Sequence, residues 1–166
     1  MKKITTRDIV SNALIAALYV VLTLITYPIS YLGIQFRFAE ILVLLCFWRK
    51  NYSVGLTIGC AIANLASSIG LVDVGFGTLA TMIACVGIMF SKWLAIACLF
   101  PVVCNAFIVG FELYQFLGLP FWLSVGEVAL GEAVVMIVGY ILFMILKRRK
   151  RFFDVIGANQ NIEFKW

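Results

Sequence analysis

Residues 121–151 read FWLSVGEVALGEAVVMIVGYILFMILKRRKR, a sequence typical of a helix that crosses a membrane. Its apolar part, Phe121 to Leu146, contains only two charged residues, Glu127 and Glu132, and five consecutive basic residues follow it. A transmembrane helix needs about 20 largely apolar residues, and basic residues gather at the cytoplasmic ends of such helices. These residues therefore predict a transmembrane helix that ends in the cytoplasm.

The composition of the whole chain agrees with this interpretation. Of its 166 residues, 64% are hydrophobic and 13% are charged, whereas soluble globular domains contain about half apolar and about a quarter charged residues. We expect an integral membrane protein with one transmembrane domain, residues 1–150, and a short cytoplasmic tail, residues 151–166. Because the chain has no histidine and no C-x-x-C pair, we expect its five cysteines to be packing residues, and no metal or cofactor.

The same length criterion predicts six transmembrane helices and an all-α fold. The predicted helices are Ile9–Tyr27, Phe36–Trp48, Tyr52–Ile69, Gly77–Phe90, Trp93–Leu117 and Phe121–Leu146. The second and the fourth are short, so we expect them to be tilted, kinked or shielded by their neighbours.

The basic residues fall almost entirely on one side of this predicted bundle. That side carries Lys2, Lys3, Arg7, Arg49, Lys50, Lys92, Lys147 to Arg151 and Lys165, and Arg37 is the only Lys or Arg expected on the other side. The positive-inside rule then places both termini in the cytoplasm. The net charge of +5 consequently reflects topology and contact with the lipid bilayer, and we expect no nucleic-acid binding.

Five of the eight acidic residues fall in the opposite, outer half of the bundle. They are Glu40, Asp73, Glu112, Glu127 and Glu132. Counted at about 1.5 Å per residue, Glu40 lies about 6 Å, Glu112 about 8 Å and Glu132 about 16 Å inside the outer helix ends. Asp73 falls in an external loop. Because an acidic residue at depth costs roughly 2.5–3.5 kcal/mol on insertion scales, it normally faces a partner or a cavity.

Amide side chains accompany these acids. Asn64 is predicted near the outer end of the third helix, while Asn105 and Glu112 are seven residues apart and share a face of the fifth helix, with Gln115 further along. We infer a polar pocket that opens outward and carries negative charge, offset by Arg37 alone. A cationic ligand, or one rich in hydrogen-bond donors, suits such a pocket.

Several of these residues also have a purely structural interpretation. Arg37 and Glu40 are spaced for an ion pair within one helix, Asp73 is placed to cap the fourth helix, and Glu127 could be solvated at the membrane interface. The one-sided distribution of all five acids favours the pocket over these separate explanations.

Two alanines of the first helix, Ala13 and Ala17, are four residues apart. A small-xxx-small spacing lets a second helix approach closely, and that helix could belong to the bundle itself or to a partner. The segment that follows, TYPISYLGIQF at residues 26–36, carries several aromatic residues and could close over the pocket as a lid.

Four runs of the sequence resemble one known family. They are IQFRFAEILVLL (34–45), GCAIANLASSIGLVDVGFGTLATMIA (59–84), PVVCNAFIVGFEL (101–113) and LPFWLSVGEVALGEAVV (119–135). Over residues 9–147 the chain is similar to the queuosine-precursor transporter (QueT) family, which comprises substrate-binding S components of energy-coupling factor (ECF) transporters. The most specific parts are the R-x-x-E of Arg37 and Glu40, the block that runs from Asn64 through GLVDVGFGTLAT, and the pair Gly131-Glu132.

The resemblance implies a fold and a set of partners. It implies the six-helix S-component bundle with both termini in the cytoplasm, and a prokaryotic cell membrane as its location. Ala13 and Ala17 would dock on a transmembrane coupling subunit that two cytoplasmic ATPase subunits drive. The chain itself lacks the G-x-x-x-x-G-K-[ST] loop of nucleotide-binding proteins, so the energy would come from those partners.

The implied ligand is a cationic 7-deazaguanine, in its aminomethyl form. One carboxylate can accept both N–H groups of a guanine-like edge, and we expect Glu132 or Glu112 in this role, with Glu40 or Asp73 near the ammonium. Asn64 and Asn105 would contact the ring, and Arg37 would orient Glu40 or donate to the ligand carbonyl. Tyr31, Phe36 and Trp122 would supply the lid and the stacking surface.

Three other functions remain to be weighed against this one. An S component for a different purine or a vitamin belongs to the same class. A small membrane enzyme is disfavoured by the absence of histidine and of metal-ligand spacing. A purely structural subunit of a membrane complex is disfavoured by the one-sided polar pocket, so we expect a transport protein and no enzyme.

Overall fold

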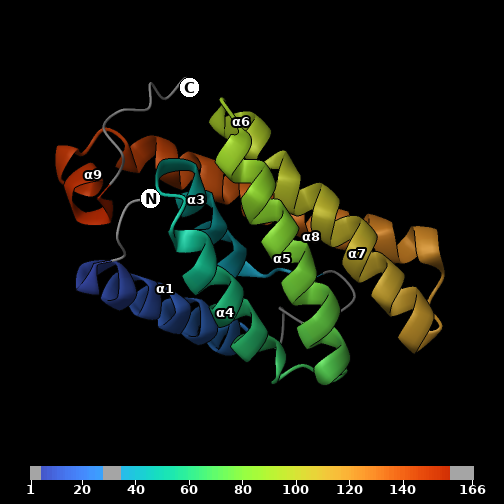
Figure 1. The fold of residues 1–166 in the computed structure, drawn as a ribbon. Coiled ribbons are helices and arrows are strands. Elements are labelled where there is room, and N and C mark those ends of the chain that lie inside the picture. Colours follow the sequence, from blue (N-terminus) through green and yellow to red (C-terminus); the bar gives the residue numbers. More distant parts are fainter. Residues whose placement is uncertain (1–4, 28–34, 158–166) are drawn as a thin grey trace.

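A computed structural model describes residues 5–27 and 35–157, and the regular elements in these ranges are all helices (Figure 1). In chain order they are α1 (Thr6–Ile25), the 3-10 helix η1 (Phe38–Leu44), α3 (Leu45–Trp48), α4 (Tyr52–Asn64), α5 (Leu71–Phe90), α6 (Leu94–Ala97), α7 (Leu99–Leu117), α8 (Phe121–Leu146) and α9 (Lys150–Ile156). Four spans are long and apolar enough to cross a membrane: α1, α5, α6 together with α7, and α8. These findings confirm an all-helical, multi-pass membrane protein.

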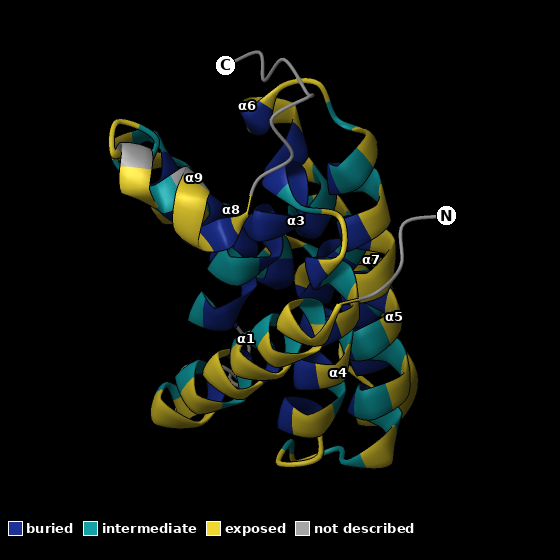
Figure 2. Ribbon diagram, turned by 60° about the vertical axis from the view of Figure 1, so that its left-hand side comes forward, coloured by how far each residue is buried: buried dark blue, intermediate teal, exposed yellow. Residues whose placement is uncertain are grey.

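Helix α1 lies at the edge of the bundle. A reciprocal capping box between Thr5 and Asp8 starts it three residues before the predicted Ile9. In its most apolar stretch only 17% of the residues are buried, compared with 39–44% in the other three long spans. Figure 2 shows mostly exposed residues along this helix. Its buried face packs on α4, where a Cβ on Gly59 would come within 2.9 Å of the Ala16 carbonyl oxygen. Glycine is therefore what allows the two helices to approach so closely.

Helix η1 occupies the centre of the bundle. It contacts α1, α4, α5 and α8, and its residues Val43 and Leu44 are fully buried in the main hydrophobic core. Outside it, α5 packs against both α4 and α7, and α7 packs against α8. The backbone that enters η1 lies directly on α8, because a Cβ on Gly131 would come within 2.4 Å of the carbonyl oxygen of Gln35. Polar residues on η1 consequently face several helices at once.

Three of the six predicted helices differ from the observed ones in form. The second, predicted as one helix over Phe36–Trp48, consists of η1 and the short α3. The third ends at Asn64 instead of Ile69. The fifth is interrupted between α6 and α7, because Pro101 cannot donate the amide hydrogen bond that would continue the helix from Ala97.

The fourth helix begins six residues earlier than predicted. Helix α5 starts at Leu71, immediately after Gly70, whose positive φ of 60° makes the turn out of α4. The prediction began this helix at Gly77 and took the residues before it, GLVDVGF, as a loop, whereas Gly75 lies inside the helix. Asp73 is therefore not in an external loop, as predicted, but in the first turn of α5 and buried.

Arg49 joins four segments at one end of the bundle. Its guanidinium pairs with Asp8 at the start of α1, and donates to the hydroxyl oxygen of Tyr52 and to the carbonyl oxygen of Ile156. The indole of Trp48 stacks on Phe143 of α8 with ring centroids 4.8 Å apart. Helix α9, at the beginning of the predicted tail, thus packs on the bundle at the end where α1 and α4 begin.

Candidate functional site

All seven polar residues that the sequence nominates for ligand binding are buried, with exposed fractions of 4% or less. They are Arg37, Glu40, Asn64, Asp73, Asn105, Glu112 and Glu132. They come from η1 and the residue before it, the last residue of α4, the first turn of α5, and the facing sides of α7 and α8. The structure therefore gathers in the interior residues that are as far as 95 positions apart, Arg37 and Glu132 being the extremes.

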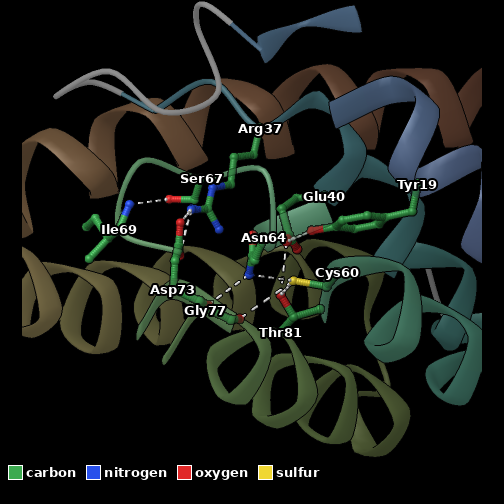
Figure 3. A network of polar contacts seen from close by, with 10 residues as sticks. All are labelled: Tyr19, Arg37, Glu40, Cys60, Asn64, Ser67, Ile69, Asp73, Gly77 and Thr81. Carbon is green, nitrogen blue, oxygen red and sulfur yellow. Dashed lines mark hydrogen bonds and ion pairs between the residues drawn. The ribbon is translucent and has the colours of Figure 1, made fainter. Parts of the chain in front are cut away.

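One part of this polar cluster is an ion pair. Arg37, which precedes η1, donates from Nη2 to Oδ1 of Asp73 at 3.2 Å and to Oδ2 at 3.3 Å (Figure 3). Asn64 donates from Nδ2 to the backbone carbonyl oxygen of Asp73 at 3.0 Å. The end of α4 and the start of α5 are thereby fixed to each other and to η1. The alternative interpretation, an ion pair of Arg37 with Glu40, is not found among the described residues, in which Arg37 pairs with Asp73.

Gly77 makes room for this arrangement. A Cβ at this position would lie 2.6 Å from Asn64 Nδ2, 2.8 Å from Asp73 Oδ1 and 3.3 Å from Arg37 Nη1. Real Cβ atoms do not approach so closely, so any side chain here would displace the three polar groups. Gly75, two residues earlier and on the opposite side of α5, has open space around it.

Glu40 is held through one of its two oxygens. Its Oε1 accepts a hydrogen bond from the hydroxyl of Tyr19 on α1 and another, at 3.0 Å, from Oγ1 of Thr81 on α5. Oε2 is buried and has no hydrogen-bond partner among the described residues. Cys60 on α4 connects this group to the ion pair, since its sulfur lies 3.3 Å from Thr81 Oγ1 and accepts from Asn64 Nδ2 at 3.4 Å.

The facing sides of α7 and α8 carry acceptors that are not satisfied. Both carboxyl oxygens of Glu112, Oε1 of Glu132 and both polar atoms of the Asn105 amide are buried without a hydrogen-bond partner among the described residues. The Asn105 amide lies close to the Glu132 carboxyl group, although the contact does not meet hydrogen-bond geometry. Because an unsatisfied buried polar group costs about 1–3 kcal/mol, these atoms mark a place that a donor-bearing ligand would stabilise.

The two parts of the cluster are electrostatically connected. Glu112 lies near enough to Asp73 and Arg37 to be influenced by both charges. Glu132 is influenced in the same way by Glu40 and Arg37. Among the described residues, the cluster thus combines four carboxyl groups with one guanidinium. This excess of acceptors favours a ligand that is cationic or rich in donors.

Some residues that the sequence nominates do not join the cluster. Trp122 is 75% exposed, because it lies on the side of α8 opposite the buried Ser124 and Val128. Its ring contacts that of Phe121. Phe36 is half-buried and packs against the main hydrophobic core. Gln115, expected on the face of Glu112, is exposed. Tyr31 lies outside the described residues.

Ala13 and Ala17 are both exposed on α1. The neighbouring Ala16 is the residue that packs inside the bundle, against Gly59 of α4. Ala13 lines a groove between α1 and α4, and packing among the described residues does not explain the spacing of Ala13 and Ala17.

Three polar residues of the cluster were not predicted from the sequence: Tyr19, Cys60 and Thr81. Thr81 lies eight residues after Asp73 and four after Gly77, so all three share one face of α5. That spacing would have revealed Thr81 if the helix had been predicted to begin at Leu71. Tyr19 follows Ala16 by one helical turn on the buried side of α1, but a single hydroxyl in an apolar helix gives no signal of its own.

The fold and the buried cluster together define a multi-pass helical membrane protein with a polar cluster in its interior. Comparison with known proteins gives a more specific result. Residues 9–148 match the QueT transporter family, and the chain belongs to this family. It is 34% identical to the queuosine precursor transporter QueT of Lactococcus lactis subsp. cremoris (strain MG1363), over 90% of this chain and 97% of that protein. No solved structure matches the chain. The membership confirms the predicted family and identifies a transporter instead of an enzyme.

Proposed function

We propose that this protein is the substrate-binding S component of an ECF-type importer and that it captures a queuosine precursor, 7-aminomethyl-7-deazaguanine, from outside the cell. Its membership of the QueT transporter family and the name of the Lactococcus relative support the choice of ligand class. The observation that carries the proposal is the set of unsatisfied acceptors on Glu112, Glu132 and Asn105. A base with several N–H donors and a cationic arm would supply what those groups lack.

The ligand would be oriented by the two halves of the cluster. Its guanine-like edge presents two parallel N–H donors. The carboxylate of either Glu112 or Glu132 accepts both hydrogen bonds, one at each oxygen. Its ammonium group lies against Oε2 of Glu40, the oxygen that Tyr19 and Thr81 leave free. Asp73 is already paired with Arg37, so of the two acids considered for the ammonium, Glu40 is the better suited. Asn105 contacts the ring.

The membrane arrangement that we propose has six spans with both termini in the cytoplasm. The two short apolar helices, Phe38–Trp48 and Tyr52–Asn64, would be the second and third spans in chain order and complete the six. The contacts of Arg49 bring the beginning of α1 and the end of α9 to the same end of the bundle. The basic residues Lys147 to Arg151 lie at that end too, as the positive-inside rule requires of a cytoplasmic side.

Helix α1 would dock the protein on its transport machinery. The exposed Ala13 and Ala17 offer a smooth face that another transmembrane helix can approach closely. We assign this face to the coupling subunit, which two cytoplasmic ATPase subunits drive.

Calorimetry on the purified full-length protein tests the proposed ligand. We expect 7-aminomethyl-7-deazaguanine to bind with sub-micromolar affinity, and the corresponding nitrile and guanine to bind more weakly because neither carries the ammonium group. A water-soluble vitamin serves as the unrelated comparison. No heat with any 7-deazaguanine, together with clear binding of another base or of the vitamin, would replace the proposal with an S component for a different metabolite.

A further inference from the structure

Helix α1 reaches into the polar cluster through one side chain. Tyr19 is only 2% exposed, and its hydroxyl donates to Oε1 of Glu40 (Figure 3). The other contacts that tie α1 to the bundle through described polar groups lie nearer its beginning, at Asp8 with Arg49 and at Asn12 with the amide of Gly55. Tyr19 is thus the point at which the most peripheral long helix touches the proposed ligand site.

The geometry of Glu40 makes that contact consequential. Oε1 accepts from Tyr19 on α1 and from Thr81 on α5, so two helices fix the plane of one carboxyl group. A carboxylate fixed at one oxygen presents its second oxygen in a defined direction. Oε2 is that second oxygen, and it is buried without a hydrogen-bond partner among the described residues. A ligand that engages Oε2 therefore acts on a group that α1 also holds.

We propose that Tyr19 is a positioning residue that ties the occupancy of the buried site to helix α1. Its hydroxyl holds Glu40 so that Oε2 faces the ligand, and it transmits a change at Glu40 to the helix whose outer face carries Ala13 and Ala17. Helix α1 also packs on α4 through Ala16 and Gly59, but the hydroxyl of Tyr19 is what joins it to Glu40. The inference rests on the proposed function for the identity of the ligand.

Hydrogen exchange of the α1 amides, residues 6–25, measures this link in the full-length protein. Saturation with 7-aminomethyl-7-deazaguanine should slow exchange in α1 of the unchanged protein roughly five-fold or more, because a helix that is held more firmly opens less often. In Tyr19→Phe the ring stays but the hydroxyl is gone, so affinity should fall roughly ten-fold. At saturation, the protection of α1 should be lost while that of α5, α7 and α8 remains.

Thr81→Val is the matched control. It removes the other hydroxyl from the same oxygen of Glu40, keeps a similar shape, and leaves α1 untouched. Affinity should fall about as much as in Tyr19→Phe, but ligand binding should still protect α1. Equal protection of α1 in Tyr19→Phe and the unchanged protein would overturn the proposal, as would a loss of protection in both variants.

A measurement without ligand separates this inference from the proposed function. Glu40→Ala leaves the buried Tyr19 hydroxyl without its acceptor, so α1 amides near Tyr19 should exchange several-fold faster than in the unchanged protein. Glu127→Ala, on the half-buried side of α8, should leave them unchanged. Unaltered exchange of α1 in Glu40→Ala would refute the link. Absence of binding by the unchanged protein would refute only the choice of ligand.

Discussion

Replacing Glu132 by glutamine should weaken ligand binding while leaving the empty protein as stable as before, or more so. Glu132 is 2% exposed in the middle of α8, and its Oε1 has no hydrogen-bond partner among the described residues. In the proposed complex, a ligand N–H group satisfies this carboxylate. Hydrogen bonds to charged groups contribute about 1.5–3 kcal/mol, so the dissociation constant should rise roughly 10- to 150-fold.

The effect on stability has the opposite sign because the empty site leaves the carboxyl group unsatisfied. Glutamine has nearly the same shape, and a neutral amide is less costly to bury than an ionised carboxyl group. We therefore expect thermal unfolding of the ligand-free variant at the same or a higher temperature. The rise in melting temperature on adding 7-aminomethyl-7-deazaguanine should shrink in parallel with the affinity.

Glu127→Gln provides the matched control on the same helix. Glu127 is half-buried and outside the cluster, so its replacement should change neither the dissociation constant from calorimetry nor the melting temperature. An unchanged dissociation constant for Glu132→Gln would remove Glu132 from the ligand site. A ligand-free variant with a clearly lower melting temperature would show that the carboxyl group has a structural partner, contrary to our interpretation.

Three further substitutions test other parts of the molecule. Ala13→Leu should abolish cellular uptake of labelled ligand while calorimetry gives an unchanged affinity, because the exposed face of α1 is remote from the cluster; a loss of binding would place Ala13 in the bundle packing. Gly77→Ala should weaken binding about ten-fold, because the added methyl group displaces the surrounding polar groups. Gly75→Ala places its methyl group in open space and should leave the affinity unchanged. Equal affinities for the two variants would contradict the close packing of polar groups around Gly77. Asp73→Asn should lower stability by about 3 kcal/mol, because the buried guanidinium of Arg37 loses its paired charge; denaturant unfolding with no change in midpoint would refute this.

The sequence predicts those parts of the fold in which hydropathy and chain breaks coincide. Helix α8 has the predicted bounds, Phe121–Leu146, because a proline precedes it and a basic run follows it. Prediction fails where a glycine lies inside a helix instead of in a turn. The helix predicted to begin at Gly77 begins at Leu71, and no local pattern distinguishes Gly75, inside this helix, from a glycine in a loop.

For the site, charge was the informative signal. The cost of burying carboxyl groups in a membrane identified Glu40, Glu112 and Glu132 from their depth alone, and the spacing of seven residues correctly placed Asn105 on the face of Glu112. Partners could not be predicted in the same way. Arg37 is three residues from Glu40 in sequence, yet its carboxylate partner is Asp73. Arg37 precedes η1 with a non-helical ψ of 80°, so the side-chain spacing of a regular helix does not apply to this pair.

Neutral groups escaped prediction for a related reason. The hydroxyls of Tyr19 and Thr81 hardly change the hydropathy of their helices, so they stand out only once the helices are assembled around Glu40. Aromatic residues mislead in the opposite direction. The indole of Trp122 suits a flat ligand, but its position on α8 decides that it faces outward, where amphipathic rings commonly settle near a membrane surface.

The pattern of satisfied and unsatisfied groups divides the cluster into two functional halves. On α4 and α5, Asp73 is paired with Arg37, which offsets much of the cost of burying both charges. On α7 and α8, Glu112 and Glu132 have no such compensation among the described residues. A ligand with donors gains most where acceptors are unsatisfied, so binding should change the α7 and α8 side far more than the preformed side. Glu40 lies between them, with one oxygen held by the protein and one left for the ligand, which is why a signal to α1 would pass through this residue.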